Sequence, residues 1–336
     1  MRNAALLGVL LASCAAAGGS PQVTSNAPEA PASEAPSAPA AKSAAQAPVG
    51  GVHRIAIAQY ALRGDASAEQ VVRRALEVVE RAAQRGAELV MFPELFVLDA
   101  WPTSSTESEA DITRRIAREV TPEAHRALEA AARRHRVAIL AGSAPELRGG
   151  ELYNTARLFL ADGSSVKQDK LRLTPWGRQI GMRGGDELTV FDAPWGRTVI
   201  LICYDVEFPS ITAALVERSA EVILVPSMTE SEAGADRVRW TAAARAVEHH
   251  AYVLVAPTAG APTDDWRHFG RAVALTPRAP GFPGVLAEAE TSEATLLLAD
   301  LDLGRLRQSR NDAGFFPARD ERERPGVGAP RGPKGR

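Results

Sequence analysis

The sequence is poor in cysteine and in aromatic residues. Its 336 residues include two cysteines, and 5% are Phe, Trp or Tyr. Because Cys14 and Cys203 stand in unrelated settings, a disulfide framework is not expected. No apolar run reaches the roughly 20 residues that a membrane-spanning helix needs. The formal net charge of −2 is close to neutral, so nothing in the composition indicates nucleic-acid binding.

Residues 1–13 have the pattern of a signal peptide. A short positive start precedes small and apolar residues at positions 4–12, a run too short to span a bilayer. Residues 11–14, Leu-Ala-Ser-Cys, resemble the lipobox of bacterial lipoproteins, which implies a lipid on Cys14 as the mature N-terminus. The alternatives are an ordinary secretory signal that ends near a cysteine, or a cytoplasmic chain with an unusual start. Ala15 is not acidic, and this favours the outer membrane over the inner one.

The rest of the chain divides by composition. Residues 14–51 consist almost entirely of Ala, Pro, Ser and other small or polar residues, which predicts a flexible tether after the lipidated cysteine. Residues 52–316 are long enough for a single large α/β domain. Residues 317–336 are rich in Arg, Glu, Gly and Pro and are expected to be disordered. The protein is therefore expected in the cell envelope, on the periplasmic face, held to the membrane by a lipid anchor only.

Strand and helix patterns alternate through the domain. A helix is expected after residue 67, with Asp65 or Ser67 as its N-cap, and another from Thr121-Pro122, read as a cap followed by proline at the first helical position. Further helices are expected at 208–219 and 236–250. A hairpin is expected around residues 161–164, Ala-Asp-Gly-Ser. Strands are predicted at residues 54–59, 89–92, 137–140, 153–160, 165–170, 197–203, 222–225, 252–256, 271–275 and 295–301.

Three reactive residues each follow a predicted strand. Glu94 comes after residues 89–93, Lys170 ends the hairpin strand, and Cys203 ends the apolar run 198–202. Because ligands collect at the carboxyl ends of strands in α/β sheets, these side chains can converge on one pocket. Taken singly, each has a simpler interpretation: a small core cysteine, a turn glutamate or a solvated lysine.

The short sequence motifs around these three residues resemble those of a known family. Phe-Pro-Glu-Leu at 92–95, Asp-Lys-Leu-Arg-Leu at 169–173 and Cys-Tyr-Asp-Val-Glu-Phe-Pro at 203–209 occur in that order. Together they resemble the nitrilase superfamily of carbon–nitrogen hydrolases over about residues 54–302. The resemblance implies an α-β-β-α sandwich that assembles as a homodimer or higher homo-oligomer. It also implies Glu94, Lys170 and Cys203 as catalytic residues.

Elementary chemistry is consistent with these roles. A thiol with a pKa near 8.5 needs activation at neutral pH, and a carboxylate such as Glu94 can accept its proton. An ammonium such as Lys170 can stabilise the oxyanion that forms when Cys203 adds to a carbonyl. The backbone N–H of Tyr204 is the expected second donor to that oxyanion. The predicted reaction releases ammonia or an amine and leaves a thioester, which water hydrolyses.

One position departs from the family pattern. Many members carry a second glutamate seven or eight residues beyond the lysine, where this chain has Gly177 and Arg178. The pocket is then either rebuilt, with Arg178 meeting an anionic substrate, or less active; alternatively, Arg178 belongs to a surface loop. Trp176, Arg178 and Ser227 are the candidate substrate-pocket residues.

The predicted function is hydrolysis of a small-molecule amide or N-carbamoyl compound, without a cofactor. The histidines have no spacing typical of a metal site, and no phosphate-binding glycine motif follows a strand. Two alternatives stay open: an acyltransferase that uses the same thioester, and a catalytically inactive binding protein of the envelope.

Overall fold

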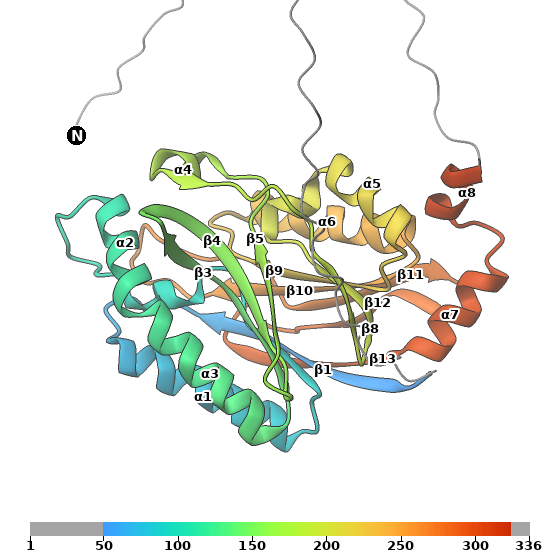
Figure 1. Cartoon of the computed structure of the whole chain (residues 1–336), viewed down its shortest axis with the longest axis horizontal. Coiled ribbons are helices and arrows are strands. Elements are labelled where there is room, and N and C mark those ends of the chain that lie inside the picture. Colours follow the sequence, from blue (N-terminus) through green and yellow to red (C-terminus); the bar gives the residue numbers. More distant parts are fainter. Residues whose placement is uncertain (1–49, 324–336) are drawn as a thin grey trace, which may run out of the picture. The chain divides into compact units, whose positions relative to one another are not determined.

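The structure is a computed structural model that describes residues 50–323, apart from the side chains of residues 216–218, 322 and 323. Figure 1 shows these residues as strands covered by helices. The strands are β1 (Val52–Ala61), β2 (Leu89–Met91), β3 (Ala138–Arg148), β4 (Glu151–Phe159), β5 (Ser165–Asp169), β6 (Met182–Arg183), β7 (Val190–Ala193), β8 (Gly196–Ile200), β9 (Val222–Ser227), β10 (Tyr252–Ala259), β11 (Val273–Ala279), β12 (Phe282–Glu288) and β13 (Thr295–Asp302). The helices are α1 (Ala68–Gln84), η1 (Phe96–Ala100), α2 (Glu109–Glu119), α3 (Thr121–His135), α4 (Pro175–Gln179), η2 (Cys203–Glu207), α5 (Pro209–Arg218), α6 (Glu232–Glu248), α7 (Leu303–Asp312) and α8 (Pro317–Glu323).

The strands form a curled mixed sheet with two halves. The first half-sheet has the order β5-β4-β3-β2-β1, with β13 antiparallel to β1. The second has the order β7-β8-β9-β10, followed by the β11–β12 hairpin. The halves join where β1 pairs with β10 in parallel, at Tyr60 with Thr258 and Ala61 with Ala259. Because this pairing involves only the strand ends, the two halves can turn to face each other.

Alternation along β1 shows how the layers are built. Ile55 and Ile57 point into a core cluster that includes Ile223 of the second half-sheet. Ala56 and Ala58 point the opposite way, into a cluster with residues of α1 and α3. Successive side chains of a strand face opposite sides, so a strand buried on both faces is apolar at every position.

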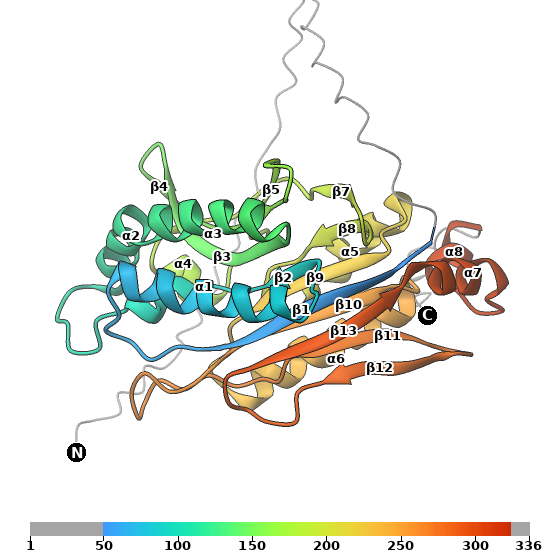
Figure 2. The same cartoon turned by 90° about the horizontal axis from the view of Figure 1, so that it is seen from below.

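Helices cover the outer face of each half-sheet. Figure 2 shows α1 and α3 on one side of the strands and α6 on the other. Valines and alanines of α1 pack with the first half-sheet, and α6 packs on β10 and β11. The expected α-β-β-α sandwich is therefore present in a single α/β domain.

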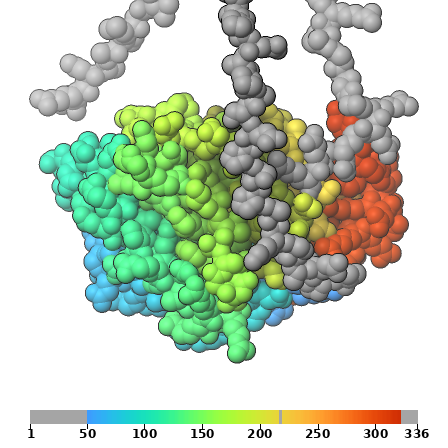
Figure 3. All heavy atoms as spheres, viewed as in Figure 1, coloured from blue at the N-terminus to red at the C-terminus, as the bar shows by residue number. Residues whose placement is uncertain are grey.

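At the surface of this domain, α4 lies beside α2, as the space-filling view shows (Figure 3), and Trp176 Nε1 donates to Glu109 Oε2 at 2.9 Å.

Local capping rules explain one helix start and fail at another. Ser67 caps α1 in a capping box with Gln70, whereas Asp65 has φ 55° and instead accepts from Thr103. The expected Thr121 cap is wrong. Val120 occupies the N-cap of α3, because α2 runs directly into α3 and leaves Thr121 inside the helix.

The two ends of the chain differ from expectation in different ways. The segment predicted to be disordered from residue 317 begins with α8, and Phe316 and Ala318 are buried where α8 packs on α5 and α6. The folded region therefore extends past the predicted limit at residue 316, because these apolar side chains find a surface to cover. The predicted signal peptide, Cys14 and almost all of the tether lie outside the described residues. Within residues 50–323, no helix is long and apolar enough to cross a membrane.

Candidate active site

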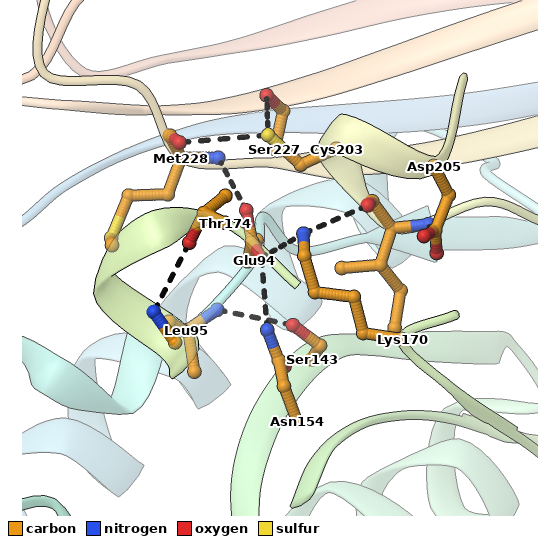
Figure 4. A network of polar contacts seen from close by, with 12 residues as sticks. Glu94, Leu95, Ser143, Asn154, Lys170, Thr174, Cys203, Asp205, Ser227 and Met228 are labelled. Atoms are coloured by element: carbon orange, nitrogen blue, oxygen red, sulfur yellow. Dashed lines mark hydrogen bonds and ion pairs between the residues drawn. The ribbon is translucent and has the colours of Figure 1, made fainter. Parts of the chain in front are cut away.

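Three strand ends bring the predicted reactive residues together. Glu94 follows β2, Lys170 follows β5 directly, and Cys203 follows β8 by way of two further buried residues. All three side chains line one cavity of about 330 Å³, and Figure 4 shows them around a common polar network. Cys203 is not part of the strand as expected, because it opens the short helix η2.

Glu94 and Lys170 form a buried ion pair. Lys170 Nζ lies 2.8 Å from Glu94 Oε1, and the exposed fractions of the two side chains are 3% and 6%. Burial alone would lower the pKa of Lys170, but the negative charges around it, that of Glu94 foremost, and the hydrogen bond to Glu94 together outweigh burial and leave this pKa raised. Lys170 is therefore a fixed positive charge beside the cavity. It also donates to the carbonyl oxygen of Ile202 at 2.9 Å, next to Cys203 in the chain.

Two further donors hold the Glu94 carboxylate. Asn154 Nδ2 donates to Oε1 at 2.9 Å, and the backbone N–H of Met228 donates to Oε2 at 3.1 Å. Both carboxylate oxygens are thus fixed from three sides by Lys170, Asn154 and Met228 (Figure 4). Charge-assisted hydrogen bonds of this kind orient a carboxylate strongly.

Cys203 sits in a strained and buried position. Its φ of 49° lies in the left-handed region, which residues other than glycine seldom adopt and which is frequent at functional sites. The thiol donates to the carbonyl oxygen of Met228 at 3.6 Å and accepts from Ser227 Oγ at 3.3 Å. Burial, followed by the negative charge of Glu94, raises the pKa of Cys203 to about 12. The raised pKa favours a neutral thiol, because burial and Glu94 together outweigh the attraction of Lys170 for a thiolate.

The backbone of Met228 connects the Glu94 carboxylate to the Cys203 thiol. Its N–H binds Glu94 Oε2 while its carbonyl oxygen accepts from Cys203 Sγ. Met228 follows the end of β9, next to β8 in the second half-sheet. The backbone of one strand end thus fixes the spacing between two side chains from the two half-sheets.

Asp205 links the segment after Lys170 to the backbone beside Cys203. It is fully buried and accepts from the backbone N–H groups of Arg172 at 2.7 Å, Ile202 at 3.1 Å and Leu171 at 3.2 Å. Burial raises the pKa of Asp205 to about 6, although the charge of Lys170 and these hydrogen bonds act in the other direction. The carboxylate therefore holds the residues beside Lys170 and Cys203 in a fixed relation.

The candidate pocket residues occupy three different places. Trp176 lines the cavity, as does Gly177. Ser227 is buried and contacts the sulfur. Arg178 is exposed, donates to the carbonyl oxygen of Leu173 at 2.6 Å, and is not among the cavity-lining residues. Tyr204 lines the cavity and is the second residue of η2, where an N–H has no acceptor inside the helix.

Sequence reasoning assigned no role to Asn154 and Asp205. Asp205 stands inside the motif at 203–209 that carried the resemblance, whereas Asn154 lies outside all three of those motifs. Their partners lie far along the chain, 60 residues away for Asn154 and Glu94 and 34 for Asp205 and Leu171. Asn154 lies inside β4 and Asp205 inside η2, so neither has the place directly after a strand that marked the predicted reactive residues. Within the described part of the chain, no group of three or more His, Cys, Asp or Glu side chains is placed to hold a metal ion.

Comparison with known proteins identifies relatives among amide hydrolases. The probable hydrolase YhcX of Bacillus subtilis is 30% identical over 275 residues, which cover 80% of this chain and 53% of that protein. This chain therefore spans about half the length of that relative. The omega-amidase NIT2 of Mus musculus is 28% identical over 246 residues, which cover 70% of this chain and 84% of the relative.

Solved structures give the same fold. A mutant amidase from Nesterenkonia sp. AN1, in which acrylamide has added to the active-site cysteine, is 25% identical with a TM-score of 0.63. The alignment covers 77% of this chain and 95% of the amidase. Nit3 of Saccharomyces cerevisiae, a member of the nitrilase superfamily, has a TM-score of 0.67 at 23% identity, covering 79% of this chain and 95% of Nit3.

The family itself matches over almost the whole folded region. Residues 54–311 match the carbon–nitrogen hydrolase family, and this stretch is more than half of the chain. With the sandwich fold and the amidase relatives, the match establishes that the chain belongs to the carbon–nitrogen hydrolases, as an amidase-like enzyme of the nitrilase superfamily.

Proposed function

We propose that this enzyme hydrolyses small linear amides or N-carbamoyl compounds through a thioester on Cys203. The observation that carries this proposal is the meeting of Glu94, Lys170 and Cys203 in one cavity, from three separate strand ends. A cavity of about 330 Å³ suits a small molecule. The active-site cysteine of the amidase from Nesterenkonia sp. AN1 also supports a cysteine nucleophile.

The first half of the reaction forms the thioester. Cys203 Sγ attacks the amide carbon while its proton passes to Glu94, because a thiol with a raised pKa needs a base during the attack. The carbonyl oxygen becomes an oxyanion, which Lys170 Nζ and the N–H of Tyr204 stabilise. The carbon–nitrogen bond then breaks, the nitrogen takes the proton from Glu94, and ammonia or an amine leaves.

The second half consumes one water. Glu94 accepts a proton from water as its oxygen attacks the thioester carbon, and the carbon–sulfur bond breaks. The sulfur regains a proton, and a carboxylic acid, or a carbamic acid from an N-carbamoyl compound, is released. In sum, one amide and one water give one acid and one ammonia or amine.

Mass spectrometry combined with ammonia release tests the proposal. The full chain is incubated with a panel of primary amides and N-carbamoyl compounds, and peptide mapping is expected to find an acyl adduct on Cys203. Cys203→Ala is expected to lose ammonia release and the adduct, while Cys14→Ser keeps both. Ammonia release that survives in Cys203→Ala would overturn the proposal. If an added amine accelerates turnover and appears in the product, the reaction is acyl transfer and not hydrolysis.

The anchor and the assembly are proposals of their own. A lipid on Cys14, outside the described residues, would hold the enzyme on the periplasmic face of the cell envelope, in the outer membrane. Loss of the protein from the membrane fraction in Cys14→Ser tests this, with the intact mass of the N-terminal peptide as the second readout. Homodimer formation is tested by light scattering on the purified full chain in detergent.

A further inference from the structure

The ionic side chains of the active-site cavity are not balanced in charge. The charged residues that line it are Glu94, Lys170, Glu207, Glu230 and Arg237. Glu94 and Lys170 compensate each other in their buried ion pair. Two carboxylates and one guanidinium remain, so the wall beyond the reactive residues has an excess of negative charge.

Glu207 lies on the cavity wall and is only partly neutralised. Its side chain is 14% exposed, whereas the side chain of its partner Arg237 is 58% exposed. The contact is single, with Arg237 Nε donating to Oε2 at 3.2 Å. Among the described residues, Oε1 of Glu207 receives no hydrogen bond. An ion pair whose cation is mostly in water is weak, so Glu207 keeps much of its negative field toward the cavity.

Asn154 Oδ1 is a buried acceptor in the same cavity that needs a partner. Asn154 is 2% exposed, and its Oδ1 has no hydrogen-bond partner within the described structure. The orientation of this amide is fixed, because its Nδ2 must donate to the Glu94 carboxylate. Glu230 is exposed, and only its Oε1 is engaged, by Trp266 Nε1 at 2.8 Å. Buried acceptors without partners mark places where a ligand donor can bind.

The backbone spacing between Cys203 and Glu207 along η2 indicates where a charge on the substrate would sit. Cys203 and Glu207 are the first and last residues of η2 and both line the cavity. Four steps of a 3₁₀-helix advance about 8 Å. A group that Glu207 binds is therefore separated from the reacting carbon by a short aliphatic chain. Of the alternatives for Arg178, the contact with an anionic substrate is not supported, because this exposed side chain donates to the carbonyl oxygen of Leu173.

We propose that Glu207 selects amides that carry an ammonium group a few carbons from the scissile bond. This inference rests on the proposed amide hydrolysis and names its substrate class. The ammonium donates to Oε1 of Glu207, with Glu230 adding to the negative potential at the exposed side of the cavity. A carboxylate at the same place on a substrate meets like charge and is rejected.

Three amides of nearly equal length test the charge preference: δ-aminovaleramide, valeramide and glutaramate, which are cationic, neutral and anionic. For the full chain, kcat/KM is expected to be about tenfold higher for δ-aminovaleramide than for valeramide, with glutaramate lowest. Added salt is expected to narrow these ratios. Glu207→Gln is expected to reduce the cation-to-neutral ratio at least fivefold, and Arg237→Gln to increase it. Glu80→Gln, a matched change on the exposed face of α1, is expected to leave the ratio unchanged.

Binding to Cys203→Ala, measured by calorimetry, separates this inference from the proposed function. Tighter binding of δ-aminovaleramide than of the other two, lost in Cys203→Ala combined with Glu207→Gln, supports the inference even if the full chain hydrolyses none of them. Equal binding of all three, or tighter binding of glutaramate, overturns it. If the full chain hydrolyses valeramide without any charge preference, the proposed function stands and the selection by Glu207 is wrong.

Discussion

Lys170 Nζ lies 2.8 Å from Glu94 Oε1, with both side chains almost completely buried. The two residues are 76 positions apart and come from the ends of β2 and β5. Removing one partner of such a pair leaves an uncompensated buried charge, which costs more than the pair contributes. The pair therefore links the stability of the domain to the chemistry of its cavity.

This linkage predicts the stability of lysine variants. Lys170→Met is expected to lower the free energy of unfolding by about 3–5 kcal/mol, because Glu94 is left buried and unpaired. Adding Glu94→Gln should recover part of that loss. Lys167→Met, on the strand β5 that precedes Lys170 and with a side chain 46% exposed, is the control and should change stability by less than about 1 kcal/mol. Urea unfolding of the full chain measures all four proteins, and a double variant no more stable than Lys170→Met would contradict the pairing argument.

The reactivity of Cys203 should follow its raised pKa. Only the thiolate reacts with iodoacetamide, and burial raises the pKa of this thiol to about 12. The alkylation rate of the Cys203 peptide should therefore rise about tenfold per pH unit from pH ~7 to ~9 without levelling off. Glutathione in the same samples should begin to level off near pH ~8.5. Mass spectrometry of the Cys203 peptide follows the reaction, and a plateau near neutral pH would mean that the resting enzyme holds a thiolate.

Asp205 should give the stability a characteristic pH dependence. Burial raises its pKa from 3.8 to about 6, so the native state binds this proton more tightly than the unfolded chain does. Asp205 therefore makes the free energy of unfolding fall as the pH rises from 3.8 to about 6, and the whole loss is present above that range.

The measurement is urea unfolding of the full chain and of Asp205→Asn at several pH values across that window. The free energy of unfolding of the full chain minus that of Asp205→Asn should fall as the pH rises through this window. The other titrating groups are present in both proteins, so their contributions cancel in the difference. Asp264→Asn changes a fully exposed carboxylate and should show no such difference. A slope of opposite sign would mean that the three N–H groups and Lys170 outweigh burial at Asp205.

Gly142 should tolerate no side chain. Its φ is +53°, and a Cβ there would overlap the carbonyl oxygen of Pro93, the residue before Glu94. Gly142→Ala is expected to cost about 3 kcal/mol or more and to reduce amide hydrolysis, because relief of the overlap displaces Glu94. Gly86 has a φ of +76° with no atom within 4 Å of an added Cβ, so Gly86→Ala isolates the backbone strain of about 1–2 kcal/mol. Equal losses of stability and activity in the two variants would contradict this.

The sequence determined the α/β class, the family and the choice of Glu94, Lys170 and Cys203 as candidates, because each of these depends on local order. Apolar strands buried on both faces, the hairpin at residues 161–164 and the words around Glu94, Lys170 and Cys203 are properties of neighbouring residues. The cap of α1 at Ser67 is likewise local. Thr121 shows the limit of such rules, since a preceding helix that continues without a break takes away the cap position.

Tertiary structure alone decided how the site is assembled. The curled sheet alone brings together the segments that these contacts join. They are the ion pair of Glu94 with Lys170, the hydrogen bond from the Met228 backbone to Glu94, and the three N–H groups that donate to Asp205. It also directed Arg178 toward a carbonyl oxygen and placed Glu207 on the cavity wall. Hydrogen bonds and burial act through space over a few ångströms, so their partners cannot be read from distances along the chain. The charge and pKa of each group therefore follow from the fold, while its identity and its place after a strand follow from the sequence.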